Sequence, residues 1–263
     1  MTAGRELTMR HTDLTTLPDA VWAETQVEVF NVSNNKLMSV SDRIGKLKSA
    51  RLVDLGHNQL RTLPDTIGDL DGLSDYLYLS DNQLVNLPAT LGRLTRLRYL
   101  NVSQNQLTRL PDSLGDMTAL VELRFTDNHV SFLPATLGRL ARLRELHAAH
   151  NELSELPESI GALENLRKLN LEANRLTTVP SSIGSLTQLF ELNVRGNRIT
   201  HWPASIRGCK RLAYIDARAN GMQIVPESFA ELPLEKLDLR WNPIERYPAW
   251  VDDLEARGCT VFR

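Results

Sequence analysis

The sequence predicts an α/β solenoid, a curved horseshoe of short coils with a parallel β-sheet on its concave face. Short helical, 3-10 or irregular segments are expected on its convex face. Three observations predict this fold: an asparagine that recurs at a nearly constant interval, an alternating leucine motif before it, and a proline-led segment after it.

The recurring asparagine sets the length of one coil. Successive members lie 22 to 24 residues apart, an interval typical of stacked repeats. The ten positions are Asn35, Asn58, Asn82, Asn105, Asn128, Asn151, Asn174, Asn197, Asn220 and Asn242. We expect each to lie where the chain leaves a strand, because its amide can satisfy backbone groups that sheet pairing no longer reaches.

The residues around each asparagine follow the pattern LxxLxLxxNxLxxLPxxIGxL. In the coil of Asn151, Leu146 and Ala148 alternate with polar residues, which indicates a strand with one buried face. Pro157 then begins a segment that does not alternate, and Glu158 follows it. Proline and an acidic residue suit the first turn of a short helix or 3-10 helix.

This pattern resembles the leucine-rich repeat family in its 23-residue form, with LP after the variable strand. That form occurs in cytoplasmic proteins of bacteria, plants and animals, including the Ras-associated and plant intracellular groups. The similarity runs from Leu7 to the carboxyl terminus. It implies a binding scaffold for a protein or peptide in intracellular signalling, with small GTPases as one class of partner.

The repeats fill the chain, so we expect residues 1–263 to form a single domain of about eleven repeats. Residues 1–23 are expected to be a degenerate amino-terminal repeat or cap, in which Val21 and Trp22 cover leucines. Residues 243–263 are expected to be a capping half repeat that adds one more strand. One extra residue in the stretch DGLSDYLYLS predicts a bulge or loop before the strand there.

The composition limits the partners and the compartment. With 42% hydrophobic residues and a formal charge of -2, the chain is expected to be a core-forming protein that binds neither nucleic acid nor membrane. The amino terminus lacks the apolar run of a signal peptide. Cys209 and Cys259 occupy core positions and are too few for a disulfide framework. We expect a cytoplasmic monomer, and secretion as an effector without a cleaved signal stays open.

Information about partners is expected on the outward residues of the parallel sheet. Three tyrosines, Tyr76, Tyr78 and Tyr99, gather on this surface near the extra residue. Tyrosine is common at interface hot spots because it buries a large area at low entropic cost. The alternative is that the three rings cover one another.

Charge is ordered along the same surface. The middle repeats are acidic, with Arg124 facing four carboxylates: Glu122, Asp127, Glu145 and Glu152. The last repeats are basic, with Arg195, Arg218 and Arg240 on the sheet and Trp241 beside them. Such a pattern can orient a complementary partner. The alternative is an internal salt-bridge lattice in which these arginines alternate with Asp216 and Asp238.

The stretch HAAH places His147 on a strand and His150 at its exit. Residues three apart in an extended segment are roughly 10 Å apart, whereas metal ligands lie about 2 Å from their ion. One ion therefore does not bind both rings, and we expect no metal and no cofactor. Both histidines stay candidates for partner contact.

No catalytic motif accompanies the repeats: the GxxxxGK, GxSxG and HExxH patterns do not occur. We therefore expect no enzyme and no catalytic residue, but a module that binds a protein or peptide on its concave face. The alternative is the substrate-recognition part of an enzyme complex, or a bacterial effector acting on host proteins. The predicted contact residues are Tyr76, Tyr78, Tyr99, Arg124, His147, His150, Arg195, Arg218, Arg240 and Trp241.

Overall fold

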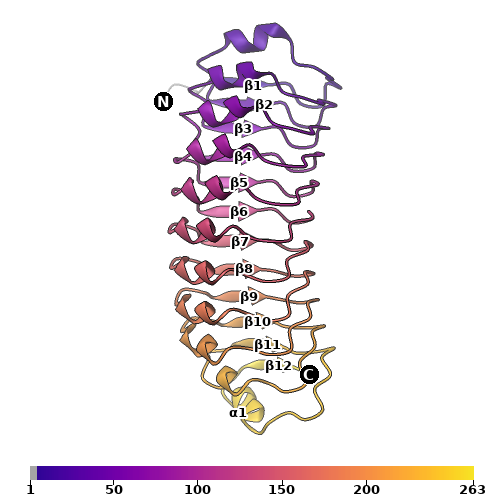
Figure 1. The fold of residues 1–263 in the computed structure, drawn as a ribbon, viewed down its shortest axis with the longest axis vertical. Helices are drawn as coiled ribbons and strands as arrows, with labels where there is room; N and C mark the ends of the chain where they lie inside the picture. The colour runs from indigo at the N-terminus through magenta and orange to yellow at the C-terminus, as the bar shows by residue number, and fades with distance from the viewer. Residues whose placement is uncertain (1–4) are drawn as a thin grey trace. The chain divides into compact units, whose positions relative to one another are not determined.

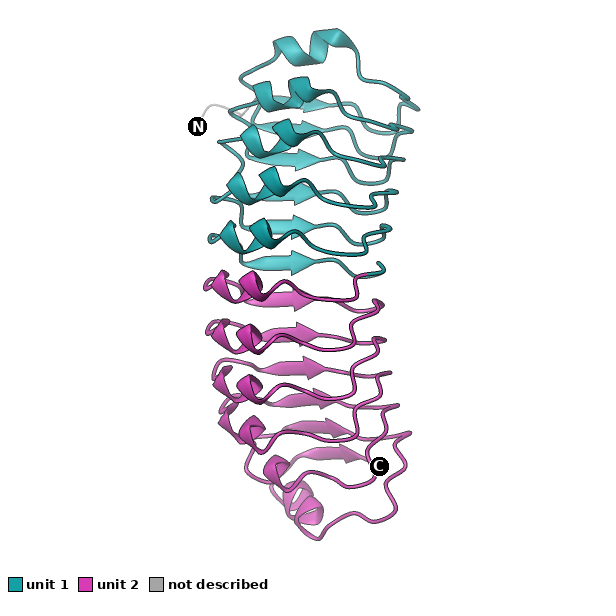
Figure 2. Cartoon of the chain, in the orientation of Figure 1, with its two compact units in different colours: residues 1–129 teal, residues 130–263 magenta. Residues whose placement is uncertain are grey.

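A computed structural model describes residues 5–263 of the chain. The chain divides into two compact units, residues 1–129 and residues 130–263 (Figure 2). Residues 1–4 of the predicted amino-terminal cap lie outside the described residues. None of the described helices has the length and hydrophobicity of a membrane-spanning segment.

The first unit is a stack of coils, each with one short strand. Its strands are all parallel and follow chain order, as Figure 1 shows. They are β1 (Glu6–Thr8), β2 (Val29–Asn31), β3 (Leu52–Asp54), β4 (Tyr76–Tyr78), β5 (Tyr99–Asn101) and β6 (Glu122–Arg124). Five 3-10 helices alternate with them: η1 (Asp19–Ala23), η2 (Asp42–Lys46), η3 (Asp65–Asp69), η4 (Ala89–Arg93) and η5 (Asp112–Asp116).

The second unit repeats this construction. Its parallel strands are β7 (Glu145–His147), β8 (Lys168–Asn170), β9 (Glu191–Asn193), β10 (Tyr214–Asp216), β11 (Lys236–Asp238) and β12 (Thr260–Phe262). Its helices are η6 (Ala135–Arg139), η7 (Glu158–Ala162), η8 (Ser181–Ser185), η9 (Ala204–Gly208), η10 (Glu227–Phe229) and α1 (Trp250–Ala256). The predicted α/β solenoid, with parallel strands alternating with 3-10 turns, is confirmed.

The middle residue of each strand points into the core and is in register with its neighbour. In the first unit Leu77 pairs with Leu100, which pairs with Leu123, and all three are fully buried. In the second unit Leu146 pairs with Leu169, and Leu169 with Leu192. One coil cannot bury its own leucines, so stacking supplies the apolar contact that each coil lacks.

Proline starts most of the 3-10 helices. It stands just before η1, η3 to η9 and η10, where its ring fixes φ between -60° and -71°. In η2 the proline is missing, and the Ser41 hydroxyl accepts a hydrogen bond from the Arg43 N–H at 3.2 Å. Ser41 therefore caps η2 at the position that proline occupies in the other 3-10 helices.

The glycine of the PxxIG motif lets neighbouring 3-10 helices approach closely. A Cβ added to any of five of these glycines would lie closer than 3.0 Å to a carbonyl oxygen of the next coil. They are Gly68, Gly92, Gly138, Gly161 and Gly184. The glycine therefore sets the distance between helices in the stack.

The recurring asparagine joins each coil to the one before it. The Asn128 Nδ2 donates to the carbonyl oxygens of Phe125 at 3.0 Å and Val102 at 3.1 Å, and its Oδ1 accepts from the Leu107 N–H at 3.0 Å. The ten recurring asparagines form what we call the asparagine ladder. These bonds recur along it, for example at Asn58, Asn105 and Asn197. The predicted role of this side chain is confirmed.

A left-handed residue precedes every ladder asparagine. In ten coils this residue has φ between 51° and 67°. The positions are Asn34, His57, Asp81, Gln104, Asp127, His150, Ala173, Gly196, Ala219 and Trp241. Asparagine, aspartate, histidine and glycine adopt this conformation more readily than other residues. His150 and Trp241, both predicted contacts, thus lie at a turn that the fold itself requires.

Both ends of the described chain are covered. Val21 and Trp22 of η1 are buried, and the Trp22 ring lies 6.2 Å from that of Phe30. At the other end β12 pairs with β11. The helix α1, which buries Val251 and Leu254, was not predicted.

Replacing Asn128 by leucine should lower the free energy of unfolding by about 2–4 kcal/mol, because buried backbone groups of two coils lose their partners. Chemical denaturation measures the change. Gln106→Leu, at an exposed position nearby, is the control and should change stability little. Equal stability of the Asn128 variant and the wild type would contradict the role of the amide.

The Cys209 thiol should resist modification in the folded protein. It is fully buried and donates to the Ile183 carbonyl oxygen at 3.1 Å, and burial raises its pKa from 9.0 to about 12. A rise of this size cuts the thiolate fraction near pH 8 by about a thousandfold. Titration with a thiol reagent should label Cys209 only after unfolding, and the Cys259→Ser variant isolates its signal. Full labelling of the folded variant would disprove the prediction.

Candidate functional site

The last residue of most strands has a structural role that the sequence interpretation missed. In seven of the ten strands from β2 to β11 it is asparagine or aspartate, whose side-chain oxygen accepts from the backbone N–H two residues later at 3.0–3.3 Å. These residues are Asn31, Asp54, Asn101, Asn170, Asn193, Asp216 and Asp238. The side chain closes the turn at the strand end, as in an Asx turn.

Three strands lack this turn-closing residue. At the same position they carry Tyr78, Arg124 and His147, all of which are predicted contact residues. None of these side chains can accept a hydrogen bond in the manner of a carboxylate or an amide oxygen at that point. The fold therefore does not explain the choice of residue at these three positions.

The three tyrosines form one cluster on β4 and β5. Tyr76 and Tyr78 stack with ring centroids 5.7 Å apart, and Tyr99 lies 5.4 Å from Tyr76 and 5.2 Å from Tyr78. The rings do cover one another, yet Tyr76 remains 42% exposed. Burial is the main influence that raises the pKa of Tyr78 and of Tyr99. Their hydroxyls therefore stay protonated at neutral pH and can donate hydrogen bonds.

A hollow of about 400 Å³ lies beside the cluster, and we call it the Tyr76 hollow. It is lined by Arg51, Asp75, Tyr76, Arg98, Tyr99, Val121 and Glu122. Arg51 pairs with Asp75 at 3.0 Å, and Arg124 pairs with Glu122. Four of the lining residues, Arg51, Asp75, Arg98 and Val121, were not singled out from the sequence; each stands one residue before its strand.

The two histidines of HAAH have separate environments in the second unit. The His147 Nε2 lies 3.1 Å from Glu145 Oε2, and the Lys168 ammonium lies 4.0 Å from the same carboxylate. His150 is exposed and has the left-handed backbone of its turn. Ala148 and Ala149, between them, are buried.

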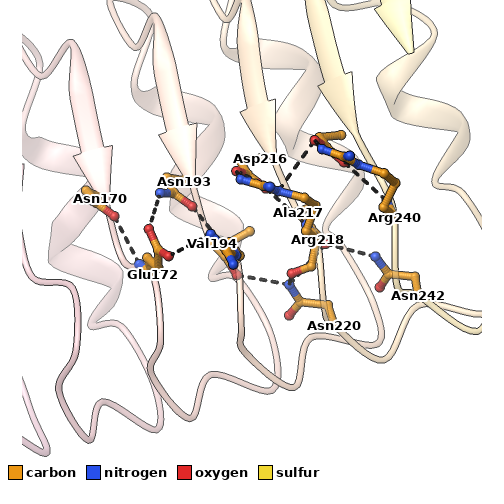
Figure 3. Close-up of polar contacts among 12 residues, drawn as sticks. Asn170, Glu172, Asn193, Val194, Asp216, Ala217, Arg218, Asn220, Arg240 and Asn242 are labelled. Atoms are coloured by element: carbon orange, nitrogen blue, oxygen red, sulfur yellow. Dashed lines mark hydrogen bonds and ion pairs between the residues drawn. The ribbon is translucent and has the colours of Figure 1, made fainter. Parts of the chain in front are cut away.

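The carboxyl-terminal arginines form the salt-bridge lattice that the sequence left as an alternative (Figure 3). The Arg218 Nε lies 2.8 Å from Asp216 Oδ1 and 3.4 Å from Asp238 Oδ2. The Arg240 guanidinium donates two hydrogen bonds to Asp238, at 2.6 and 2.9 Å. Burial alone would raise the pKa of Asp238, but the hydrogen bonds and charges of Arg240 and Arg218 lower it.

Arg195 extends the lattice, and Trp241 covers it. The Arg195 guanidinium lies 3.3 Å from Glu172, which also accepts from the Asn193 amide at 3.0 Å. The Trp241 ring centroid lies 5.5–5.9 Å from the guanidinium carbons of Arg195, Arg218 and Arg240. Trp241 is still 64% exposed. The positive charges are thus neutralised within the lattice, and the indole is its most open group among these residues.

Replacing Asp238 by asparagine should lower the free energy of unfolding by about 3 kcal/mol, because Arg218 and Arg240 would lose a buried shared carboxylate. The pKa of Asp238 is below its ordinary 3.8, so its stabilisation is present above that pH and is lost as the pH falls through the lowered pKa. The variant should therefore lose less stability than the wild type between pH 4 and pH 2.

Asp252→Asn is the matched control. Asp252 pairs with Arg263 at 2.6 Å, but its carboxylate is 70% exposed, so its removal should cost less than about 0.5 kcal/mol. Denaturation curves at several pH values compare the two variants. Equal effects of the two substitutions would show that burial of the lattice carboxylate does not matter.

The fold places the chain among known proteins. The sequence profile described as a leucine-rich repeat region matches residues 25–152 and 128–245. No curated protein sequence matches the chain. The structure is similar to the plant peptide hormone receptor RGFR1 in complex with RGF2, at 28% identity and a TM-score of 0.84 over 98% of this chain and 47% of the receptor.

Two further structures are similar. A TDR receptor matches at 27% identity and a TM-score of 0.78, over 88% of this chain and 41% of the receptor. The internalin InlF of Listeria monocytogenes matches at 17% identity and a TM-score of 0.69, over 98% of this chain and 80% of the internalin, which supports the fold alone. The chain spans less than half the length of either receptor.

The leucine-rich repeat fold is a protein–protein interaction module, and its members are generally binding scaffolds without enzymatic activity. The matched profile spans most of the chain, and the described strands are parallel and follow chain order. The chain belongs to the leucine-rich repeat family.

Proposed function

We propose that the protein binds a protein or peptide partner on the outward face of its strands, and that the contact centres on Tyr76, Tyr78, Tyr99 and Arg124. The family is an interaction module, and the similar receptor RGFR1 has been captured with RGF2. The outward position of these residues on β4, β5 and β6 supports the proposal, and binding on the concave side of the solenoid stays a prediction.

The replacement of the turn-closing residue by Tyr78 and Arg124 carries the proposal. Seven strands use this position for an Asx turn. Tyrosine and arginine give up that hydrogen bond and place large side chains on the surface instead. Both residue types are enriched at the positions that contribute most to binding free energy.

The arrangement of the rings favours tight contact. Tyr76, Tyr78 and Tyr99 restrict one another by packing, so little side-chain entropy is lost when a partner covers them. Their hydroxyls can donate hydrogen bonds to a partner, and Arg124 adds a guanidinium beside them. The cluster can therefore bury apolar area and satisfy polar groups of the same partner.

The second unit supplies secondary contacts in this proposal. His147 replaces a turn-closing residue, and the exposed Trp241 and His150 project from left-handed turns. Arg195, Arg218 and Arg240 would meet a partner as an ordered pattern of paired charges. A small GTPase as partner, a monomeric state and intracellular signalling in the cytoplasm stay predictions.

Quantitative affinity capture tests the proposal. A variant with Tyr78→Ala and Arg124→Ala should capture about one tenth or less of the partner that the wild type captures. The reason is that a hot spot contributes roughly 2 kcal/mol or more to binding. The control carries Phe132→Ala and Ile224→Ala, which remove exposed side chains outside the strands. Full binding by the Tyr78 and Arg124 variant would contradict the proposal. Loss of binding by the control would place the site outside the strands.

A further inference from the structure

We propose that the Tyr76 hollow binds the side-chain carboxylate of an aspartate or glutamate on the partner polypeptide, with Arg98 as its ion-pair partner. This inference rests on the proposed function and specifies which partner chemistry the tyrosine face selects. Four observations support it: the extra residue in this repeat, the hydrogen bonds that the residue displaces, the volume of the hollow and the charge balance around it.

The extra residue lies where the hollow forms. The interval from Asn58 to Asn82 is 24 residues, one more than in most coils. It is accommodated in the loop before β4, while β4 keeps its parallel register with β3 and β5. The strand itself therefore has no bulge, and the added length changes only the edge at which the strands begin.

The hydrogen bonds at this edge show the displacement. In other coils the residue before a strand donates its N–H to the corresponding residue of the coil before, as Val121 does to the Arg98 carbonyl oxygen at 2.8 Å. Arg98 itself donates to Ser74 at 3.0 Å, one residue earlier than that pattern gives. The Asp75 carbonyl oxygen is thus not the acceptor for Arg98, and the Asp75 side chain forms an ion pair with Arg51. The insertion thus changes the backbone hydrogen bond at the edge just before β5, while β4 and β5 themselves stay in register.

The hollow has the size and walls for one anchoring side chain and its neighbours. Its volume is about 400 Å³, and sites of roughly 300 Å³ and above hold small organic groups. Tyr76 and Tyr99 provide aromatic walls, and Arg51 and Arg98 provide guanidinium groups. Guanidinium groups bind carboxylates in a planar, bidentate geometry.

Of the two arginines that line the Tyr76 hollow, Arg98 has no ion pair with any residue that the structure describes. Arg51 is paired with Asp75, and Arg124 with Glu122. Within residues 5–263, Arg98 has no ion pair, and its side chain is exposed. Arginines on the sheet of the second unit differ, because Arg195, Arg218 and Arg240 each face a carboxylate of this chain. An incoming carboxylate would complete the third pair beside the tyrosines.

Selection from a randomised peptide library tests the inference. The library peptides are acetylated and amidated at their ends, so that only side chains carry carboxylates. Peptides selected on the wild type should be enriched in Asp or Glu next to an aromatic or aliphatic residue. Selection on the Arg98→Gln variant should lose the acidic preference. The control is Arg96→Gln, which removes an exposed arginine of the same coil that does not line the hollow.

The affinity of one selected peptide for the wild type and for the Arg98→Gln variant gives a quantitative test. Changing its acidic residue to the amide should weaken binding to the wild type by about tenfold and to the Arg98→Gln variant by less than about twofold, as for a charge-assisted pair. An equal loss on both proteins, or a wild-type selection without acidic enrichment, would overturn the inference.

The same peptides separate this inference from the proposed function. Tyr76→Ala combined with Tyr78→Ala should abolish their binding. If those changes abolish binding while Arg98→Gln does not, the tyrosine face binds partners and the carboxylate assignment is wrong. If the library yields no peptide that depends on either set of residues, both proposals are wrong.

Discussion

The asparagine ladder is the constraint on which the rest of the structure depends. Each strand has only three residues, so most backbone groups of a coil lie outside the sheet and need other partners. One amide serves groups of its own coil and of the coil before it, as Asn128 does for Phe125, Val102 and Leu107. Without it the chain could not turn inward after every strand, and buried polar groups would offset much of the free energy from the leucine core.

The helical side and the strand side of a coil tolerate different kinds of residue. On the helical side the glycine contacts and the proline starts leave little freedom, because a Cβ at Gly68 or Gly161 would collide with the next coil. On the strand side the outward residues are free of the core but divide into two kinds. Asparagine and aspartate close turns, whereas Tyr78, Arg124 and His147 do not. The turn-closing residues are needed by the fold, whereas the residues that replace them are available to a partner.

The sequence predicted the strands and the ladder, because these follow from a period and an alternation that the repeats share. It did not predict α1, although Pro248 and Asp252 near its start and Val251 and Leu254 at helical spacing are usable signals. It also missed that Asn170 and Asp216 close turns at their strand ends. These turn closures depend on the backbone conformation within one coil, whereas the lattice of Arg218 and Asp238 and the hollow beside Arg98 depend on side chains of adjacent coils.

The close approach at the glycines also bears on how such a protein changes over time. A side chain at such a glycine would collide with the neighbouring coil, so the outward strand positions and the loops before them offer more room for substitution. The single extra residue before β4 is tolerated because it lengthens a loop and leaves the pitch of the stack intact. New specificity can therefore arise by inserting or exchanging residues on one edge, without rebuilding the scaffold that presents them.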